Sequence, residues 1–188
     1  MLGSRLVSRM ALLNMKHNSV VETYRGSLWC ENGRPRTYAH AISCLGQGFG
    51  GYYPWMPTIK SGMATAAKDD KPLLVIIHKS WCSSSCALAE SARKCPEMIR
   101  LANFFIMVNL RDDQEPKDKK YMPDGGYTPR ALFFTPQGEF RPDIINHAGP
   151  TQYQFYYPNA SELAKSMALA LKRMKPLIYK EFCCCHPA

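Results

Sequence analysis

The sequence predicts an α/β domain with a mixed central sheet of about four strands flanked by helices. Two observations lead to this prediction. Apolar runs of strand length are separated by stretches whose apolar residues recur at helical spacing, in the order helix, strand, helix, strand, two further strands and a closing helix. The chain has 188 residues, 46% of them hydrophobic and 21% charged, so it is also long enough to bury a core of its own.

The chain divides into three parts. Residues 1–45 contain glycine, proline and scattered charge without sustained periodicity, which indicates a leader or a poorly ordered N-terminal extension. Residues 46–176 hold all of the predicted strands and helices and form the predicted domain. Residues 177–188 are a Cys-rich tail. Its cluster Cys183-Cys184-Cys185-His186 could bind a metal or take palmitate, but adjacent cysteines reach one ion poorly, so we expect a disordered tail.

The first predicted helix precedes the first predicted strand. The helix is expected to begin at Trp55, with Pro57 near its first turn where proline is tolerated, and to end in the charged segment 68–72. Leu73–Ile77 is then a continuous apolar run rich in β-branched residues. Such a run predicts a strand that is buried on both faces, as in the middle of an α/β sheet.

A second helix opens at Cys82 and continues through Ala87–Lys94, a run of good helix formers. Cys95-Pro96 falls inside this stretch, and proline removes an intrahelical hydrogen bond. We therefore expect the helix to kink or restart there. The second strand follows at Phe104–Leu110.

The remaining strands are expected to form a hairpin. Arg130–Phe134 is the third predicted strand, Pro136–Gly138 a tight turn, and Glu139–Ile145 the fourth strand. The third and fourth strands would then be antiparallel neighbours.

A closing helix is predicted at Ser161–Met174, where apolar residues recur on one face. Asn159 or Ser161 is its expected N-cap. Asn159-Ala160-Ser161 is also a glycosylation sequon, which matters only if the chain enters the secretory pathway.

The junction between the first strand and the second helix carries the candidate chemistry. The strand runs through His78 and Lys79 into Trp81 and Cys82, and Cys82 opens the helix. A cysteine in the first turn of a helix faces unpaired N–H groups and the positive end of the helix dipole, and both favour the reactive thiolate. Cys82 is therefore the candidate nucleophile.

The partner of Cys82 is ambiguous in the sequence. A redox pair usually has two cysteines separated by two residues, but the third residue after Cys82 is Ser85 and the next cysteine is Cys86. In one alignment Ser85 replaces the resolving cysteine. In the other, one serine is inserted and Cys86 is a displaced resolving cysteine.

An ordered series of motifs resembles the thioredoxin-fold proteins. More narrowly, it resembles the small endoplasmic-reticulum thioredoxin-like proteins, the family of thioredoxin domain-containing protein 12 and the anterior-gradient proteins. The resemblance covers roughly residues 45–174. The segments that carry it are Gly48-Phe49-Gly50, Trp55, His78–Cys82, Asn103–Leu110, Glu115–Asp118, Pro123–Arg130 and Asp143–Asn146.

The resemblance implies a thioredoxin fold and a thiol–disulfide oxidoreductase or isomerase that acts on protein disulfides through Cys82, with Cys86 as the candidate resolving cysteine. It implies that Thr128-Pro129 is the cis-proline segment and, with Trp81, contributes to substrate binding. The implied partners are cysteine-containing client proteins and glutathione or another thiol. No cofactor is expected, and the implied compartment is the lumen of the endoplasmic reticulum.

Two other functions compete. If Ser85 replaces the resolving cysteine, the chain would be a non-enzymatic protein that traps clients with one working cysteine. A less favoured alternative is copper binding by Cys82, Cys86 and His147, since soft thiolates and an imidazole suit copper.

Lys79 is a supporting candidate at the thiol site, because its charge would stabilise a nearby thiolate.

Composition argues against several other classes. The formal net charge is +9, but no basic stripe with interleaved aromatic residues is present, so nucleic-acid binding is not expected. No run of about 18 apolar residues exists, so no membrane span is expected. Leu2–Lys16 is closer to a mitochondrial presequence than to a signal peptide, and the last four residues are not a reticulum-retention signal. A mitochondrial or cytosolic compartment therefore stays open.

Overall fold

The central strand is apolar throughout, and this sets the architecture. In the computed structural model, which describes residues 45–184, β2 (Leu73–His78) is buried along its whole length. It pairs in parallel with β3 (Ile106–Arg111) on one side and antiparallel with β4 (Arg130–Phe134) on the other. The short β1 (Trp55–Met56) pairs in parallel with β3. The sheet order is therefore β1-β3-β2-β4, and the predicted mixed four-stranded sheet is confirmed.

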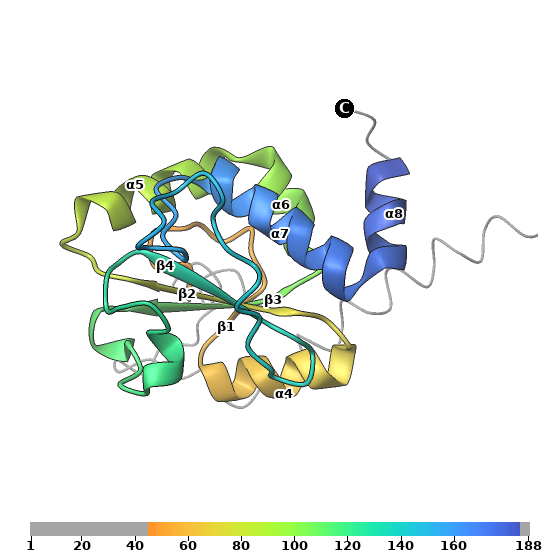
Figure 1. The fold of residues 1–188 in the computed structure, drawn as a ribbon, viewed down its shortest axis with the longest axis horizontal. Coiled ribbons are helices and arrows are strands. Elements are labelled where there is room, and N and C mark those ends of the chain that lie inside the picture. The colour runs from red at the N-terminus through yellow and green to blue at the C-terminus, as the bar shows by residue number, and fades with distance from the viewer. Residues whose placement is uncertain (1–44, 185–188) are drawn as a thin grey trace, which may run out of the picture. The chain divides into compact units, whose positions relative to one another are not determined.

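Helices cover both faces of this sheet (Figure 1). Helix α4 (Ile59–Asp69) lies on one face, and α5 (Ser83–Lys94), α6 (Pro96–Ala102) and α7 (Ala160–Met174) lie on the other. Because side chains alternate along a strand, β2 contributes to two separate cores. Leu74 and Ile76 pack in the core under α5–α7, whereas the alternate residues Leu73, Val75 and Ile77 pack in the core under α4.

Helix α4 sits close to the sheet because it carries a glycine at the contact. A Cβ atom added to Gly62 would lie 2.6 Å from Cγ2 of Val108 and 3.1 Å from Cδ1 of Leu73. No real Cβ approaches that closely, so a larger residue at Gly62 would push α4 away from the sheet.

The expected start of the first helix was wrong. Trp55 lies in strand β1, and the helix begins at Ile59 after the N-cap residue Thr58. The Thr58 side chain accepts from the Ser61 N–H, and the Ser61 hydroxyl accepts from the Thr58 N–H, so this capping box fixes the start. Pro57 therefore precedes the helix rather than lying in its first turn.

The predicted fourth strand was also wrong. Between Glu139 and Ile145 only Phe140 forms a bridge, with Phe134, although Thr135 and Glu139 close the predicted turn. Pro142 has no N–H to donate to a ladder. Next to it, the Asp143 carboxylate accepts hydrogen bonds from Arg141 and from Arg173 of α7. These side-chain contacts, rather than further backbone hydrogen bonds to β4, hold this segment.

The other boundaries follow the sequence more closely. Helix α5 ends at Lys94 and α6 restarts with Pro96 as its first residue, as the Cys95-Pro96 pair predicted. Asn159 is the N-cap of α7: its Oδ1 accepts from the Glu162 N–H, and its Nδ2 donates to Oε1 of Glu162, both at 3.0 Å. The predicted cap is therefore confirmed.

The start of the predicted tail is helical. Helix α8 (Pro176–Cys184) follows α7, and the rings of Phe182 and Phe104 meet edge to face at 6.0 Å between centroids. This contact with the main core contradicts the expectation of disorder up to Cys184. Leu45 packs against the same core. The rest of the N-terminal extension and the last four residues lie outside the described residues, and the domain boundaries stay predictions.

Two short 3₁₀ helices, η1 (Asp112–Gln114) and η2 (Lys119–Tyr121), lie in the connection from β3 to β4. Within residues 45–184, no helix combines the length and the apolar character needed to cross a bilayer.

Candidate thiol–disulfide site

Cys82 lies between the central strand β2 and helix α5. It is the N-cap residue of α5, and the Cys86 N–H donates to the Cys82 carbonyl oxygen at 3.0 Å. The helix is therefore regular from its first turn and contains no bulge. Ser85 occupies the third helical position, and Cys86 the fourth.

The Cys82 thiol is half-buried and has a polar partner. Its Sγ donates to the carbonyl oxygen of Thr128 across 3.6 Å. Partial burial acts to raise the thiol pKa, but polar interactions with the Ser85 side chain and N–H, with Thr128 and with the Ser84 N–H outweigh it. The pKa of Cys82 is lowered as a result, which favours the thiolate as nucleophile.

Ser85 and Cys86 point to different environments. Ser85 is 1% exposed, and its Oγ accepts from the Lys79 N–H at 3.3 Å. Cys86 is exposed, and its Sγ lies 3.4 Å from the Ser80 carbonyl oxygen. The buried position three residues after Cys82 is thus a serine, whereas Cys86 lies on the solvent side. Both Cys82 and Cys86 are free thiols.

The predicted substrate-binding residues surround the thiol. The Thr128–Pro129 peptide bond is cis, as the resemblance implied, and it precedes β4 directly. Thr128 is half-buried and Pro129 is buried. Trp81, the residue before Cys82, exposes 78% of its surface and is one of the few large exposed apolar side chains among the described residues.

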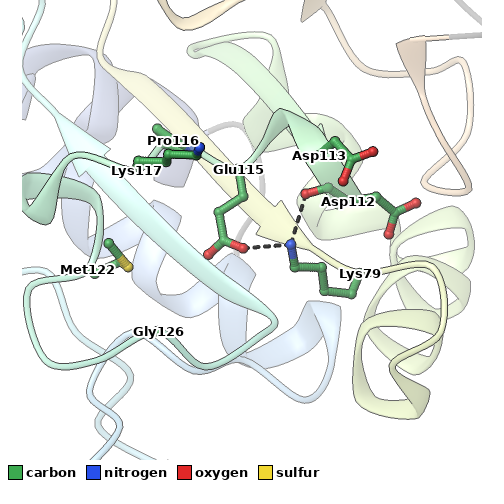
Figure 2. A pocket seen from close by; sticks show the side chains of 8 residues that line it. All are labelled: Lys79, Asp112, Asp113, Glu115, Pro116, Lys117, Met122 and Gly126. Atoms are coloured by element: carbon green, nitrogen blue, oxygen red, sulfur yellow. Dashed lines mark hydrogen bonds and ion pairs between the residues drawn. The ribbon is translucent and has the colours of Figure 1, made fainter.

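Lys79 does not face the thiol as a free charge. Its Nζ forms an ion pair with Oε2 of Glu115 at 2.6 Å and donates to the Asp112 carbonyl oxygen at 2.8 Å, as Figure 2 shows. The carboxylate offsets the lysine charge at short range. A direct electrostatic effect of Lys79 on Cys82 is therefore not what this geometry favours.

An open pocket of about 620 Å³ lies beside this ion pair (Figure 2). Part of its wall comes from the loop that leads to Thr128, and part from the segment after β3. The lining residues are Lys79, Asp112, Asp113, Glu115, Pro116, Lys117, Met122 and Gly126.

Sequence reasoning missed the ionic cluster around Glu115. Arg130 is fully buried, and its guanidinium pairs with Glu115 and donates to the carbonyl oxygens of Tyr121 and Tyr127. A signal was present in the sequence: an arginine that heads an otherwise apolar strand needs a buried acidic partner. The mixed charges of residues 111–120 by themselves indicate only a solvated connection.

His78 is buried at the end of β2 and packs edge to face on Phe49, 5.1 Å between ring centroids. Burial is the main cause that lowers its pKa to about 4. The imidazole is therefore neutral near pH 7.

The copper alternative is not supported by the geometry. His147 is exposed in the connection between β4 and α7. The described residues contain no group of three or more histidine, cysteine or acidic side chains placed to hold a metal ion. Cys82, Cys86 and His147 therefore do not form a metal site in this structure.

Comparison with known proteins agrees with this geometry. A family model described as thioredoxin-like matches residues 54–136, so the chain contains a thioredoxin-like domain with a cysteine at the strand-to-helix junction. Anterior gradient protein 3 from Mus musculus is 35% identical over 129 residues, covering 68% of this chain and 77% of that protein. Anterior gradient protein 2 homolog from Homo sapiens is 31% identical over 131 residues, covering 70% and 74%. The chain belongs to the anterior-gradient family.

The narrower resemblance to thioredoxin domain-containing protein 12 stays a prediction. Among solved structures, the C-terminal domain of DsbD from Neisseria meningitidis in the reduced form overlaps with a TM-score of 0.39 and 17% identity, covering 59% of this chain and 92% of that one. A disulphide isomerase from Xylella fastidiosa Temecula1 overlaps with a TM-score of 0.37 and 22% identity, covering 44% and 67%.

Proposed function

We propose that this chain is a thiol–disulfide oxidoreductase or isomerase that acts on disulfides of client proteins through Cys82. The observation that carries the proposal is the position of Cys82. It caps α5, it has a lowered pKa, and its Sγ lies 3.6 Å from the carbonyl oxygen of Thr128, next to a cis proline. Together these features describe a nucleophilic thiol.

The exchange step needs no cofactor. The Cys82 thiolate attacks one sulfur of a client disulfide, a new S–S bond joins Cys82 to the client, and the other client sulfur leaves as a thiolate. A second thiolate then attacks the mixed disulfide and frees Cys82. If that thiolate belongs to the client, the client is isomerised. If it is glutathione and attacks the client sulfur, the client leaves as a mixed disulfide with glutathione. If glutathione attacks the Cys82 sulfur instead, the client leaves as a thiol and Cys82 carries glutathione, which a second glutathione removes as oxidised glutathione.

The substrate site is the surface around Thr128. An extended client segment can pair with the backbone of the half-buried Thr128, which gives affinity without strong sequence preference. Trp81 offers an exposed aromatic face beside the attacking sulfur. Its large apolar surface suits the unfolded, partly apolar segments that surround unpaired cysteines in clients.

The geometry favours a single working cysteine within the first turn. Ser85 is buried at the third position after Cys82, and α5 is regular there, which supports the alignment in which serine replaces the resolving cysteine. A chain of this type needs an external thiol to release its clients. If that release is slow, the protein acts as a client trap rather than as an enzyme.

A second candidate is a dithiol mechanism with Cys86 as the resolving cysteine. It is favoured by the exposure of Cys86 and by the contact of its Sγ with Ser80, two residues before Cys82. Residues four apart on a helix have nearly parallel Cα–Cβ vectors, so a Cys82–Cys86 bond requires the first turn of α5 to unwind.

One experiment separates these possibilities. The full chain is treated with oxidised glutathione, alkylated, and weighed as wild type, Cys86→Ser and Cys82→Ser. We expect a glutathione adduct on Cys82 in the first two proteins and none on that residue in the third. An internal disulfide that disappears in Cys86→Ser would instead establish the dithiol mechanism, and no adduct on Cys82 at all would refute the proposed nucleophile.

Turnover distinguishes an enzyme from a trap. The wild-type chain is incubated with a scrambled disulfide client and reduced glutathione, and both native client and mixed disulfide are followed over time. An enzyme regains free Cys82 and accumulates native client, whereas a trap accumulates a stable mixed disulfide.

The compartment follows the family resemblance, and we place the chain in the lumen of the endoplasmic reticulum. An oxidising lumen would supply both client disulfides and glutathione. Expression of the tagged full chain, followed by protease protection of the isolated organelle, tests this; a tag that is accessible in the cytosol contradicts it.

A further inference from the structure

Two segments far apart in the sequence meet at the thiol. One is the loop from Lys79 to Cys82, which follows β2. The other is the Thr128–Pro129 segment, which precedes β4. The contact between Cys82 Sγ and Thr128 O exists only while these two segments keep their relative position.

The carboxylate of Glu115 contacts both sides of this junction. Its Oε2 pairs with Lys79 Nζ at 2.6 Å, at the start of the Cys82 loop. Its Oε1 pairs with Nη2 of Arg130, the residue that follows Pro129 in the chain. Arg130 is fully buried and also donates to the carbonyl oxygens of Tyr121 and Tyr127, so it fixes the loop that carries Thr128.

A neighbour on the same segment strengthens the hold on the Cys82 loop. Asp112 accepts from the Ser80 N–H through Oδ1 at 2.7 Å and from Lys79 Nζ through its carbonyl oxygen at 2.8 Å. Its φ of 54° lies in the left-handed region, which is costly for a residue other than glycine. A strained conformation of this kind persists where surrounding contacts stabilise it. Here the hydrogen bonds that Asp112 accepts from Lys79 and Ser80 are such contacts.

We propose that Glu115 is a positioning residue of the thiol site, whose one carboxylate keeps the Cys82 loop and the Thr128–Pro129 segment in register. This inference rests on the proposed role of Cys82 as nucleophile and assigns its reactivity to a residue that does not touch it. Burial alone acts to raise the pKa of Glu115, but its bonds to Lys79 and Arg130 outweigh it and lower the pKa, so the carboxylate is ionised at neutral pH.

The sign of the effect separates positioning from simple charge. Removing a negative charge near a thiol, and freeing the lysine it paired with, would by itself lower the thiol pKa. Loss of register removes the interaction with the Thr128 side chain that lowers the pKa of Cys82, and this raises the pKa. Positioning therefore predicts the opposite sign from charge.

The test measures the pH dependence of Cys82 alkylation by iodoacetamide in the full chain, site by site, after trypsin digestion. For Glu115→Gln we expect Cys82 alkylation at pH 7 to slow about three- to tenfold, with the rate midpoint moved to higher pH. Cys86 lies on the same tryptic peptide and serves as an internal reference. Glu90→Gln is the matched control, because Glu90 forms an exposed ion pair with Lys94 of α5 and contacts neither segment.

A second variant keeps the test decisive if loss of the carboxylate next to buried Arg130 impairs folding. Glu115→Asp keeps the charge but shortens the side chain, so charge predicts no change whereas positioning predicts slower alkylation. Slowing in either folded variant relative to Glu90→Gln supports the proposal. Alkylation that is unchanged or faster in both overturns it. Since iodoacetamide needs no client, the result is readable even if the exchange function fails its own test.

Discussion

Cys82 and Cys95 occupy the same kind of position in two consecutive helices. Cys82 is the N-cap of α5, and Cys95 is the N-cap of α6. Both have extended backbone angles, with φ and ψ of −86° and 118° for Cys82 and −93° and 101° for Cys95. Both are half-buried free thiols. If a helix N-terminus alone made a reactive cysteine, the two would be equivalent.

Their surroundings are different. Cys82 meets the Thr128 carbonyl oxygen and the polar groups of Ser84 and Ser85. Cys95 packs against the apolar core under α5–α7, and the first residue after it is Pro96, which has no N–H to offer. An N-cap cysteine therefore forms a thiol site only when polar groups and a substrate-facing segment lie next to its sulfur.

The largest expected difference between the two cysteines is in exchange itself. We expect Cys82→Ser to reduce mixed-disulfide formation with a client at least about 100-fold, because the attacking sulfur is gone. Cys95→Ser should change the rate less than about twofold. Non-reducing electrophoresis of trapped complexes measures both, and a comparable loss in the two variants would break the comparison.

A gain of function sharpens the comparison further. Ser85→Cys places a second thiol at the buried third position after Cys82, so we expect an internal disulfide and release of mixed disulfides accelerated about tenfold or more. Met98 is the third residue after Cys95, and Met98→Cys creates the same spacing on α6. That control variant should gain no exchange with clients. Mass spectrometry under non-reducing conditions and release kinetics are the measurements.

The pH profile of Cys82 should differ from that of an ordinary thiol. Because the pKa of Cys82 lies below its ordinary value of 9.0, its alkylation should reach a plateau at lower pH than that of an ordinary thiol. At pH 7 we expect Cys82 to react about tenfold faster than a free reference thiol, and this ratio should shrink as pH rises toward 9. A ratio that is constant with pH would assign the difference to accessibility alone.

The smallest expected effect is on stability. A thiol whose pKa is lower in the folded state contributes stability above its unfolded pKa, and that contribution is lost as pH falls through the folded pKa. The stability of wild type relative to Cys82→Ser should therefore increase between pH 7 and 9. The change should stay under about 1 kcal/mol, because the thiol is partly solvated.

Urea unfolding at several pH values checks this stability prediction. Cys95→Ser provides the reference, and its stability relative to wild type should not follow the Cys82 curve. A decrease with rising pH in the stability of wild type relative to Cys82→Ser would show that the sign of the Cys82 pKa shift is wrong.

The sequence was most informative where one residue type leaves few choices. Leu73–Ile77 has five apolar residues in a row, which only a doubly covered strand accommodates at this length. Cys95-Pro96 was expected to interrupt a helix because proline lacks an N–H, and Asn159 was one of two expected caps of the closing helix. The position of Cys82 at a helix start follows from the same local rules.

It was least informative where distant partners decide. The segment after Pro136–Gly138 has strand-like composition, but Arg173 of α7 holds Asp143 and the ladder stops after one bridge. Glu115 was hidden in a charged stretch because its partners, Lys79 and Arg130, are 36 and 15 residues away. The ambiguity between Ser85 and Cys86 could be addressed only once the regular first turn of α5 was visible.

The cap of α7 has a consequence for biosynthesis. The Nδ2 atom of Asn159 is the atom that would carry a sugar in the sequon Asn159-Ala160-Ser161, and it already donates to Glu162. Attachment of a glycan would therefore compete with this hydrogen bond once the first turn of α7 has formed. If the chain enters the lumen, the fraction of molecules that carry a glycan at Asn159 would depend on the rate of glycan transfer relative to the rate of folding. Slowing the folding of the C-terminal half should raise occupancy, measured by glycosidase treatment of wild type against Asn159→Gln.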